Sequence, residues 1–103
     1  MKEINLRHLN WMIEDILKYE SGKIHFSELV NSLDVLISSG EFVADLENKL
    51  LSMWGVLEES YAFMLYEERD NLDSEDLRAT SKALENMKKL ILVTLTDNET
   101  PKN

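Results

Sequence analysis

The chain has 103 residues, the size of one globular domain, which leaves no room for a catalytic domain beside a regulatory one. Hydrophobic residues make up 44%, which excludes a disordered body, and 3 glycines with 1 proline are too few for the turns of a β-sandwich. With no cysteine, disulfides and thiolate metal sites are excluded, and 20 acidic against 11 basic residues, a net charge of −9, argue against nucleic acid as a direct partner. A basic protein is the natural complement of such a chain.

The first ten residues alternate charged and apolar side chains, without the continuous apolar stretch of a signal peptide. The longest apolar stretches, such as Leu90–Val93, are far shorter than the ~20 residues of a membrane-spanning helix. We therefore expect a cytoplasmic protein that does not bind membranes.

The first predicted helix covers residues 6–20, because apolar residues recur there at steps of three and four. Asn5 is its expected N-cap, and Gly22 is placed to end it in a left-handed turn. The stripe consists of Leu6, Leu9, Ile13, Ile16 and Leu17.

The second predicted helix covers residues 26–38, with His25 at the N-cap position and Gly40 at its end. The same helical spacing defines its apolar stripe. That stripe consists of Phe26, Leu29, Val30, Leu33, Leu36 and Ile37.

The third predicted helix is the long one, covering residues 41–69, and Ser52 and Gly55 are the places where it is expected to bend or break, if it does. Its apolar residues are spaced close to a heptad. They are Leu46, Leu50, Met53, Leu57, Tyr61 and Met64.

The fourth predicted helix begins after Asp73 and ends near Leu95, and a polar tail, residues 97–103, is expected to be disordered. Four amphipathic helices joined by short loops predict an all-α fold. We expect a four-helix antiparallel up-down bundle over residues 1–96, with a long third helix.

The acidic residues gather in one segment. Residues 41–76 contain 11 acidic and 2 basic residues, so this segment alone has a net charge of −9. A solvated helix face and a docking surface for a basic partner both explain such a cluster. Its densest part consists of Glu58, Glu59, Glu67, Glu68, Asp70, Asp73, Glu75 and Asp76.

Apolar and aromatic residues also lie on the side of the third helix that faces away from its buried stripe. Either this part of the helix is central in the bundle, or its far side is an interface with aromatic anchors ringed by acids. The residues on that side are Val56, Glu59, Phe63, Tyr66 and Glu67.

The two tryptophans differ in their expected positions. Trp54 is expected in the core, whereas the exposure of Trp11 stays open. With Arg7 and Asp15, Trp11 could form a second, smaller contact patch.

Catalytic and metal sites find little support in the sequence. Neither His8 nor His25 has a glutamate three residues before it, as a di-iron bundle requires. Glu58 and Glu59 point about 100° apart on a helix and do not share a substrate atom easily. Phosphate-binding glycine loops and HExxH motifs are absent from the sequence. We expect no enzymatic activity, no metal and no cofactor.

Two segments carry a family resemblance. The Gly-x-Ile-x-Phe-Ser-x-Leu junction at 22–29 and the Trp-x-x-Leu-Glu-x-x-Tyr segment at 54–61 resemble the small acidic helical immunity proteins of bacterial competition systems. The similarity is to proteins like the colicin D immunity protein and those of contact-dependent growth inhibition.

The resemblance implies a protein that binds the carboxyl-terminal nuclease domain of a cognate toxin, often an RNase that cleaves tRNA. An acidic helix surface would then occupy the basic cleft as an RNA mimic. Carried over to this sequence, the candidate contact residues are Glu58, Glu59, Phe63, Tyr66, Glu67, Asp70, Asp73, Glu75 and Asp76.

The expected function is that of an immunity protein, monomeric when free, that neutralises a nuclease toxin by occlusion. Two alternatives stay open. One is a helical adaptor or chaperone that binds a secreted effector without blocking an active site. The other is a small regulator that forms homodimers through the aromatic face of the third helix.

Overall fold

A computed structural model of the protein describes residues 1–99. Four helices make up most of this part: α1 (Glu3–Glu20), α2 (Phe26–Ser39), α3 (Ala44–Tyr66) and α4 (Ser74–Glu99). Over the described range the chain forms no strand, so the prediction of an all-α, four-helix fold is confirmed.

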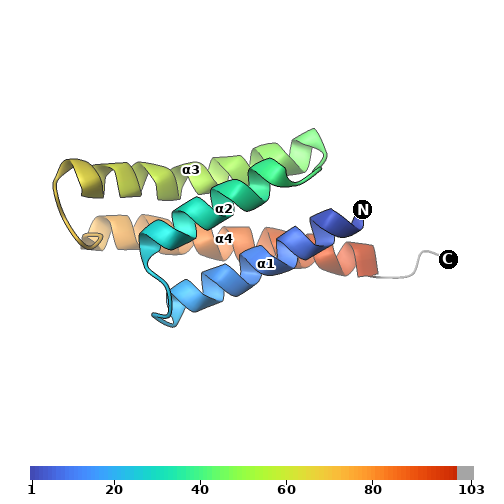
Figure 1. Ribbon diagram of the computed structural model, residues 1–103, viewed down its shortest axis with the longest axis horizontal. Helices are drawn as coiled ribbons and strands as arrows, with labels where there is room; N and C mark the ends of the chain where they lie inside the picture. Colours follow the sequence, from blue (N-terminus) through green and yellow to red (C-terminus); the bar gives the residue numbers. More distant parts are fainter. Residues whose placement is uncertain (100–103) are drawn as a thin grey trace.

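The helices run back and forth along one axis. Figure 1 shows the α1–α2 and α3–α4 connections at one end of the bundle and the α2–α3 connection at the other. At the first end, Nε2 of His25 lies 3.4 Å from the carbonyl oxygen of Asp70. Each helix packs against the next in the chain, and α4 packs against α1, which closes a ring of four.

The core lies along the axis of this ring, where the apolar stripes of the four helices meet. Trp54 packs against it while partly buried, and its indole Nε1 donates to the carbonyl oxygen of Val30 at 2.9 Å. The large apolar side chains that are completely or almost completely buried are Leu9, Met12, Ile16, Leu29, Leu33, Ile37, Leu50, Leu57, Leu84, Met87 and Ile91.

The start of α1 differs from the prediction. The helix begins at Glu3 with Lys2 as its N-cap, so Asn5 is not a cap. Instead the Asn5 side chain is buried and hydrogen-bonds the backbone of Glu41 in the α2–α3 connection. Beyond the other end of α1, Gly22 adopts a left-handed conformation with φ 79°, as predicted.

The start of α2 agrees with the prediction. His25 is its N-cap, and Nδ1 of the imidazole accepts a hydrogen bond from the backbone N–H of Ser27 at 3.1 Å. Gly40 follows the last helical residue, in an extended conformation.

Helix α3 is long, with 23 residues, and it passes through Ser52 and Gly55 without a break. It is shorter at both ends than the predicted 41–69, and one cause at its start is that Asn5 holds the backbone of residue 41. Helix α4 is longer still, with 26 residues.

The end of α4 was predicted wrongly. The helix continues through Glu99, so residues 97–99 belong to it and not to a disordered tail. The side-chain amide of Asn98 donates to the carbonyl oxygen of Thr94 at 2.8 Å, which adds a hydrogen bond in this last turn. The remainder of the predicted tail, 100–103, lies outside the described residues.

Candidate functional site

The outward side of α3 is exposed and rich in apolar residues. Phe63 is 52% exposed and Tyr66 is 86% exposed, although both are large aromatic side chains. Leu50 and Leu57 of the same helix are fully buried. The interpretation of α3 as a central helix is therefore wrong, because a helix at the corner of a four-membered ring buries only one side.

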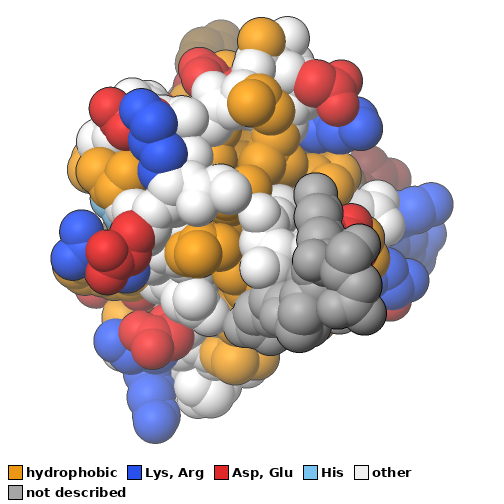
Figure 2. Space-filling model, turned by 90° about the vertical axis from the view of Figure 1, so that its right-hand side faces the viewer, with side chains coloured by type: hydrophobic (Ala, Val, Ile, Leu, Met, Phe, Trp, Pro, Cys, Tyr) orange, Lys and Arg blue, Asp and Glu red, His pale blue; other side chains and the backbone are white. Residues whose placement is uncertain are grey.

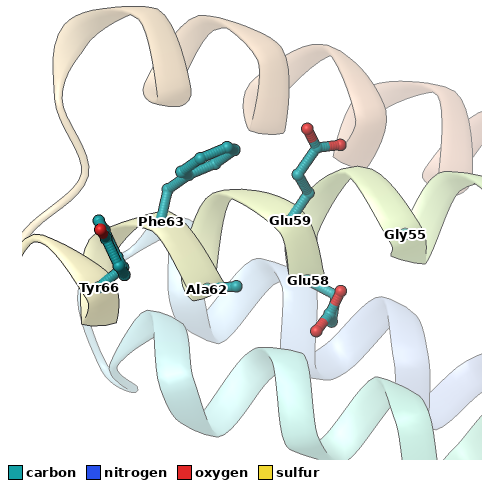
Figure 3. A pocket seen from close by; sticks show the side chains of 6 residues that line it. All are labelled: Gly55, Glu58, Glu59, Ala62, Phe63 and Tyr66. Carbon is teal, nitrogen blue, oxygen red and sulfur yellow. The ribbon is translucent and has the colours of Figure 1, made fainter.

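Six residues on this side form a shallow groove of about 600 Å³, named here the α3 groove: Gly55, Glu58, Glu59, Ala62, Phe63 and Tyr66. They lie three or four residues apart and therefore share one face of the helix. Figure 3 shows Gly55 and Ala62 along the middle of this face, Glu58 on one side, and Glu59 with Phe63 on the other. The α3 groove thus has a floor without large side chains and carboxylates along both rims.

The two rim carboxylates have no counter-ion within the described part of the chain. Both Glu58 and Glu59 are exposed, and neither forms an ion pair with any residue in the 1–99 range. Exposed carboxylates without a partner give a local negative potential that attracts cations.

The far end of the bundle differs from the α3 groove in how its charges are arranged. Figure 2 looks at the end that holds the α2–α3 connection, where basic and acidic side chains occur side by side. There Nζ of Lys2 lies 2.9 Å from a carboxylate oxygen of Glu41. Glu41 thus has a cation beside it at this end, whereas Glu58 and Glu59 form no ion pair within residues 1–99.

Arg69, in the α3–α4 connection, compensates three of the predicted contact residues. Its guanidinium nitrogens lie 2.8 Å from Glu67, 3.4 Å from Asp73 and 3.3 Å from Asp76. Partial burial on its own lowers the pKa of Arg69, but the hydrogen bond that Arg69 donates to Asp76 and the surrounding negative charges raise it overall. These three carboxylates already have a cation within the fold and are less available to a partner.

Asp73 has a second structural role, because it caps α4. Its Oδ1 accepts a hydrogen bond from the backbone N–H of Asp76 at 2.8 Å. This hydrogen bond is the main cause that lowers the pKa of Asp73; partial burial opposes it, and the charge of Arg69 adds to it.

Asp70 and Glu75 lie outside the α3 groove. Asp70 lines a separate hollow of about 370 Å³ at the bundle end, beside His25 and Tyr19. Burial, helped by the negative charge of Glu20, raises the pKa of Tyr19 there. Glu75 is exposed in the first turn of α4.

The predicted contact residues thus divide into two groups. Four of them line the α3 groove: Glu58, Glu59, Phe63 and Tyr66. Five lie at the α3–α4 connection or in the first turn of α4: Glu67, Asp70, Asp73, Glu75 and Asp76.

Trp11 is 55% exposed and lies in a groove of about 420 Å³ between α1 and α2, beside the exposed Val35. The patch of Trp11 with Arg7 and Asp15 does not form as predicted, because Asp15 is buried. The hydroxyl of Ser32 on α2 donates to the Asp15 carboxylate, which turns this acid towards the neighbouring helix.

Three residues that matter for this surface were missed from the sequence. Gly55 and Ala62 form the floor of the α3 groove. A glycine inside an amphipathic helix could have indicated this floor, but Gly55 was interpreted as a possible break in the helix. Arg69 carried a signal too, as one of only two basic residues in the acidic segment.

Within residues 1–99, no three histidine, aspartate or glutamate side chains are arranged to hold a metal ion. None of the four helices, over the described part, is both long and apolar enough to cross a membrane.

The chain matches no protein-family model, and comparisons with curated proteins and with solved structures found no similar protein. The function is therefore argued from the α3 groove and its surroundings.

Proposed function

We propose that this protein is an immunity protein that binds a cognate nuclease toxin, an RNase that cleaves tRNA being the preferred class, and neutralises it by occlusion. The observation that carries the proposal is the combination, in one exposed groove, of two exposed aromatic rings with two carboxylates that form no ion pair within residues 1–99. Such a surface fits a basic protein better than any small polar ligand.

The aromatic and acidic residues have separate roles in this proposal. Burial of Phe63 and Tyr66 against a partner removes large apolar areas from water and supplies affinity. Glu58 and Glu59 steer a basic partner and select it against others, so association slows as the salt concentration rises.

A nuclease cleft binds RNA phosphates and is therefore lined with basic side chains. The carboxylates of the α3 groove would take the place of those phosphates, and the body of the bundle would keep RNA out. The inhibition is stoichiometric and needs no chemical step on the side of this protein.

Co-expression tests the proposal. The protein is produced together with the product of the gene adjacent to its own, while survival of the cells and integrity of their tRNA are scored. Rescue with intact tRNA is expected. A neighbouring product that is harmless, or that kills regardless, would contradict the proposal.

The exposed aromatic face also favours a second candidate, a regulator that forms homodimers. In a two-fold dimer through this face, however, the Glu58 and Glu59 carboxylates of one copy would approach those of the other, which is repulsive. A monomer in sedimentation at micromolar concentration would exclude the homodimer. An adaptor for an effector would bind its partner yet leave that partner active.

A further inference from the structure

Gly55 lies inside α3, where glycine is the poorest helix former apart from proline. Among the described residues, a Cβ atom at this position meets nothing within 4 Å, so none of the neighbouring helices requires the missing side chain. Its φ is not positive either, since Gly22 is the glycine with a positive φ in the described part of the chain. Neither packing within the protein nor backbone conformation explains a glycine here.

What the glycine does shape is the α3 groove. Gly55 and Ala62 lie two turns apart on the same face, and the Glu58 and Glu59 side chains diverge from the helix between them (Figure 3). The result is a narrow floor along the helix axis, bounded by a carboxylate on each rim. A larger side chain at position 55 or 62 would fill this floor.

The ends of the floor are not equivalent. Beyond Ala62 lie Phe63 and Tyr66, whose exposed rings stand at one end of the α3 groove, and Figure 3 shows Phe63 on the same rim as Glu59. A carboxylate and an aromatic ring on one rim suit a planar cation, which pairs with the first and stacks on the second.

We infer that the α3 groove receives one arginine side chain of the basic partner, with its carbon chain over the floor at Gly55 and its guanidinium against the Glu59 carboxylate and the Phe63 ring. This inference rests on the proposed function and names the side chain that the site selects. Arginine fits better than lysine, because a guanidinium forms two parallel hydrogen bonds to a carboxylate and an ammonium does not. Gly55 is then a specificity-determining residue.

A peptide of six arginines with blocked ends serves as the probe, and one of six lysines as its comparator. Binding to the full chain is followed by amide chemical shifts in ¹⁵N NMR spectra. The shifts are expected to concentrate on residues 55–66, with an affinity for the arginine peptide at least threefold above that for the lysine peptide.

The decisive variants are Gly55→Leu and Ala62→Leu, each of which fills the floor without changing charge. Both are expected to weaken binding of the arginine peptide about tenfold or more. The matched control is Asn48→Leu, which places the same side chain on the same exposed face two turns before Gly55, outside the α3 groove. It is expected to bind like the unchanged protein, and circular dichroism confirms that all three variants remain helical.

The inference is wrong if the two floor variants, Gly55→Leu and Ala62→Leu, bind the arginine peptide as well as Asn48→Leu does. It is also wrong if the chemical-shift changes spread evenly over the acidic surface, or if the two peptides bind with equal affinity. Growth rescue separates this failure from that of the proposed function. If Gly55→Leu rescues fully while reversal of Glu58 and Glu59 abolishes rescue, the arginine site is wrong and the immunity function stands. If the unchanged protein rescues nothing, the proposed function itself fails.

Discussion

The side-chain amide of Asn5 satisfies both backbone groups of Glu41. Its Nδ2 donates to the carbonyl oxygen at 3.0 Å, and its Oδ1 accepts from the N–H at 2.7 Å. Asn5 is only 4% exposed, so its own end of these part-buried hydrogen bonds is shielded from water. They tie the first turn of α1 to the α2–α3 connection.

Replacing Asn5 with alanine leaves a backbone donor and acceptor without partners, and each such buried group costs about 1–3 kcal/mol. We expect Asn5→Ala to lower the free energy of unfolding by about 2 kcal/mol or more in urea denaturation. The control is Asn10→Ala, because the Asn10 side chain bonds the carbonyl oxygen of Leu6 on the exposed side of α1. Similar small losses in the two variants would contradict this role of Asn5.

The imidazole of His25 caps α2, since its Nδ1 accepts a hydrogen bond from the backbone N–H of Ser27. We expect His25→Ala to lower the free energy of unfolding by about 1 kcal/mol, the usual cost of losing a cap. His25→Asn keeps a capping acceptor and is expected to retain most of the stability. The interpretation is wrong if asparagine and alanine destabilise equally.

Two glycines are expected to respond to alanine in opposite directions. Gly55→Ala adds a Cβ that meets nothing within 4 Å in the described structure, so the free energy of unfolding should rise by up to about 1 kcal/mol. Gly22→Ala places a side chain at φ 79° and should lower it by about 1 kcal/mol or more. Thermal or urea denaturation shows whether each variant is more or less stable than the unchanged protein. A loss of stability in Gly55→Ala would contradict the description of the α3 groove floor.

The cap at Asp73 predicts a dependence of stability on pH. The folded protein lowers the pKa of this carboxyl below its ordinary value of 3.8, so the unfolded chain binds its proton at higher pH than the folded protein does. The stabilising contribution is therefore complete above the ordinary pKa and is lost as the pH falls through the lower, folded pKa. Asp73→Asn retains a capping side chain but should flatten this part of the acid denaturation curve.

An NMR titration of the side-chain carboxyl carbon of Asp73 checks the cause directly. Its midpoint is expected below 3.8 in the unchanged protein. In Arg69→Gln the midpoint should move part of the way back, since the Asp76 hydrogen bond remains. A midpoint at or above the ordinary value would contradict the arrangement.

The sequence predicted those features of the fold that depend on helical periodicity or on residues close together in the chain. The α2 cap at His25 and the left-handed Gly22 follow from residues close in the chain, and both are confirmed. The role of Asn5 could not be predicted, because its partner lies 36 residues away and adjoins it only through the packing of the helices. The acceptors of Arg69 likewise depend on how the α3–α4 connection folds.

The sequence alone could not predict which face of α3 stays exposed. Apolar residues lie on both sides of the helix, so periodicity could not distinguish a central helix from an outer one. The packing of the helices decides that α3 is an outer helix, since Leu50 and Leu57 are fully buried and Phe63 and Tyr66 are exposed. The groove residues Glu58, Glu59, Phe63 and Tyr66 were predicted together, while the glycine and alanine between them were not.

The most direct test of the central claim is the affinity for the product of the adjacent gene, measured by titration calorimetry on two double charge reversals. Glu58→Lys with Glu59→Lys changes the α3 groove, whereas Glu3→Lys with Glu14→Lys makes the same change in net charge on exposed positions of α1. We predict that the first pair weakens binding at least tenfold more than the second, a difference of about 1.4 kcal/mol or more. Equal losses in the two pairs would mean that only net charge matters and would contradict the assignment of the α3 groove as the binding surface.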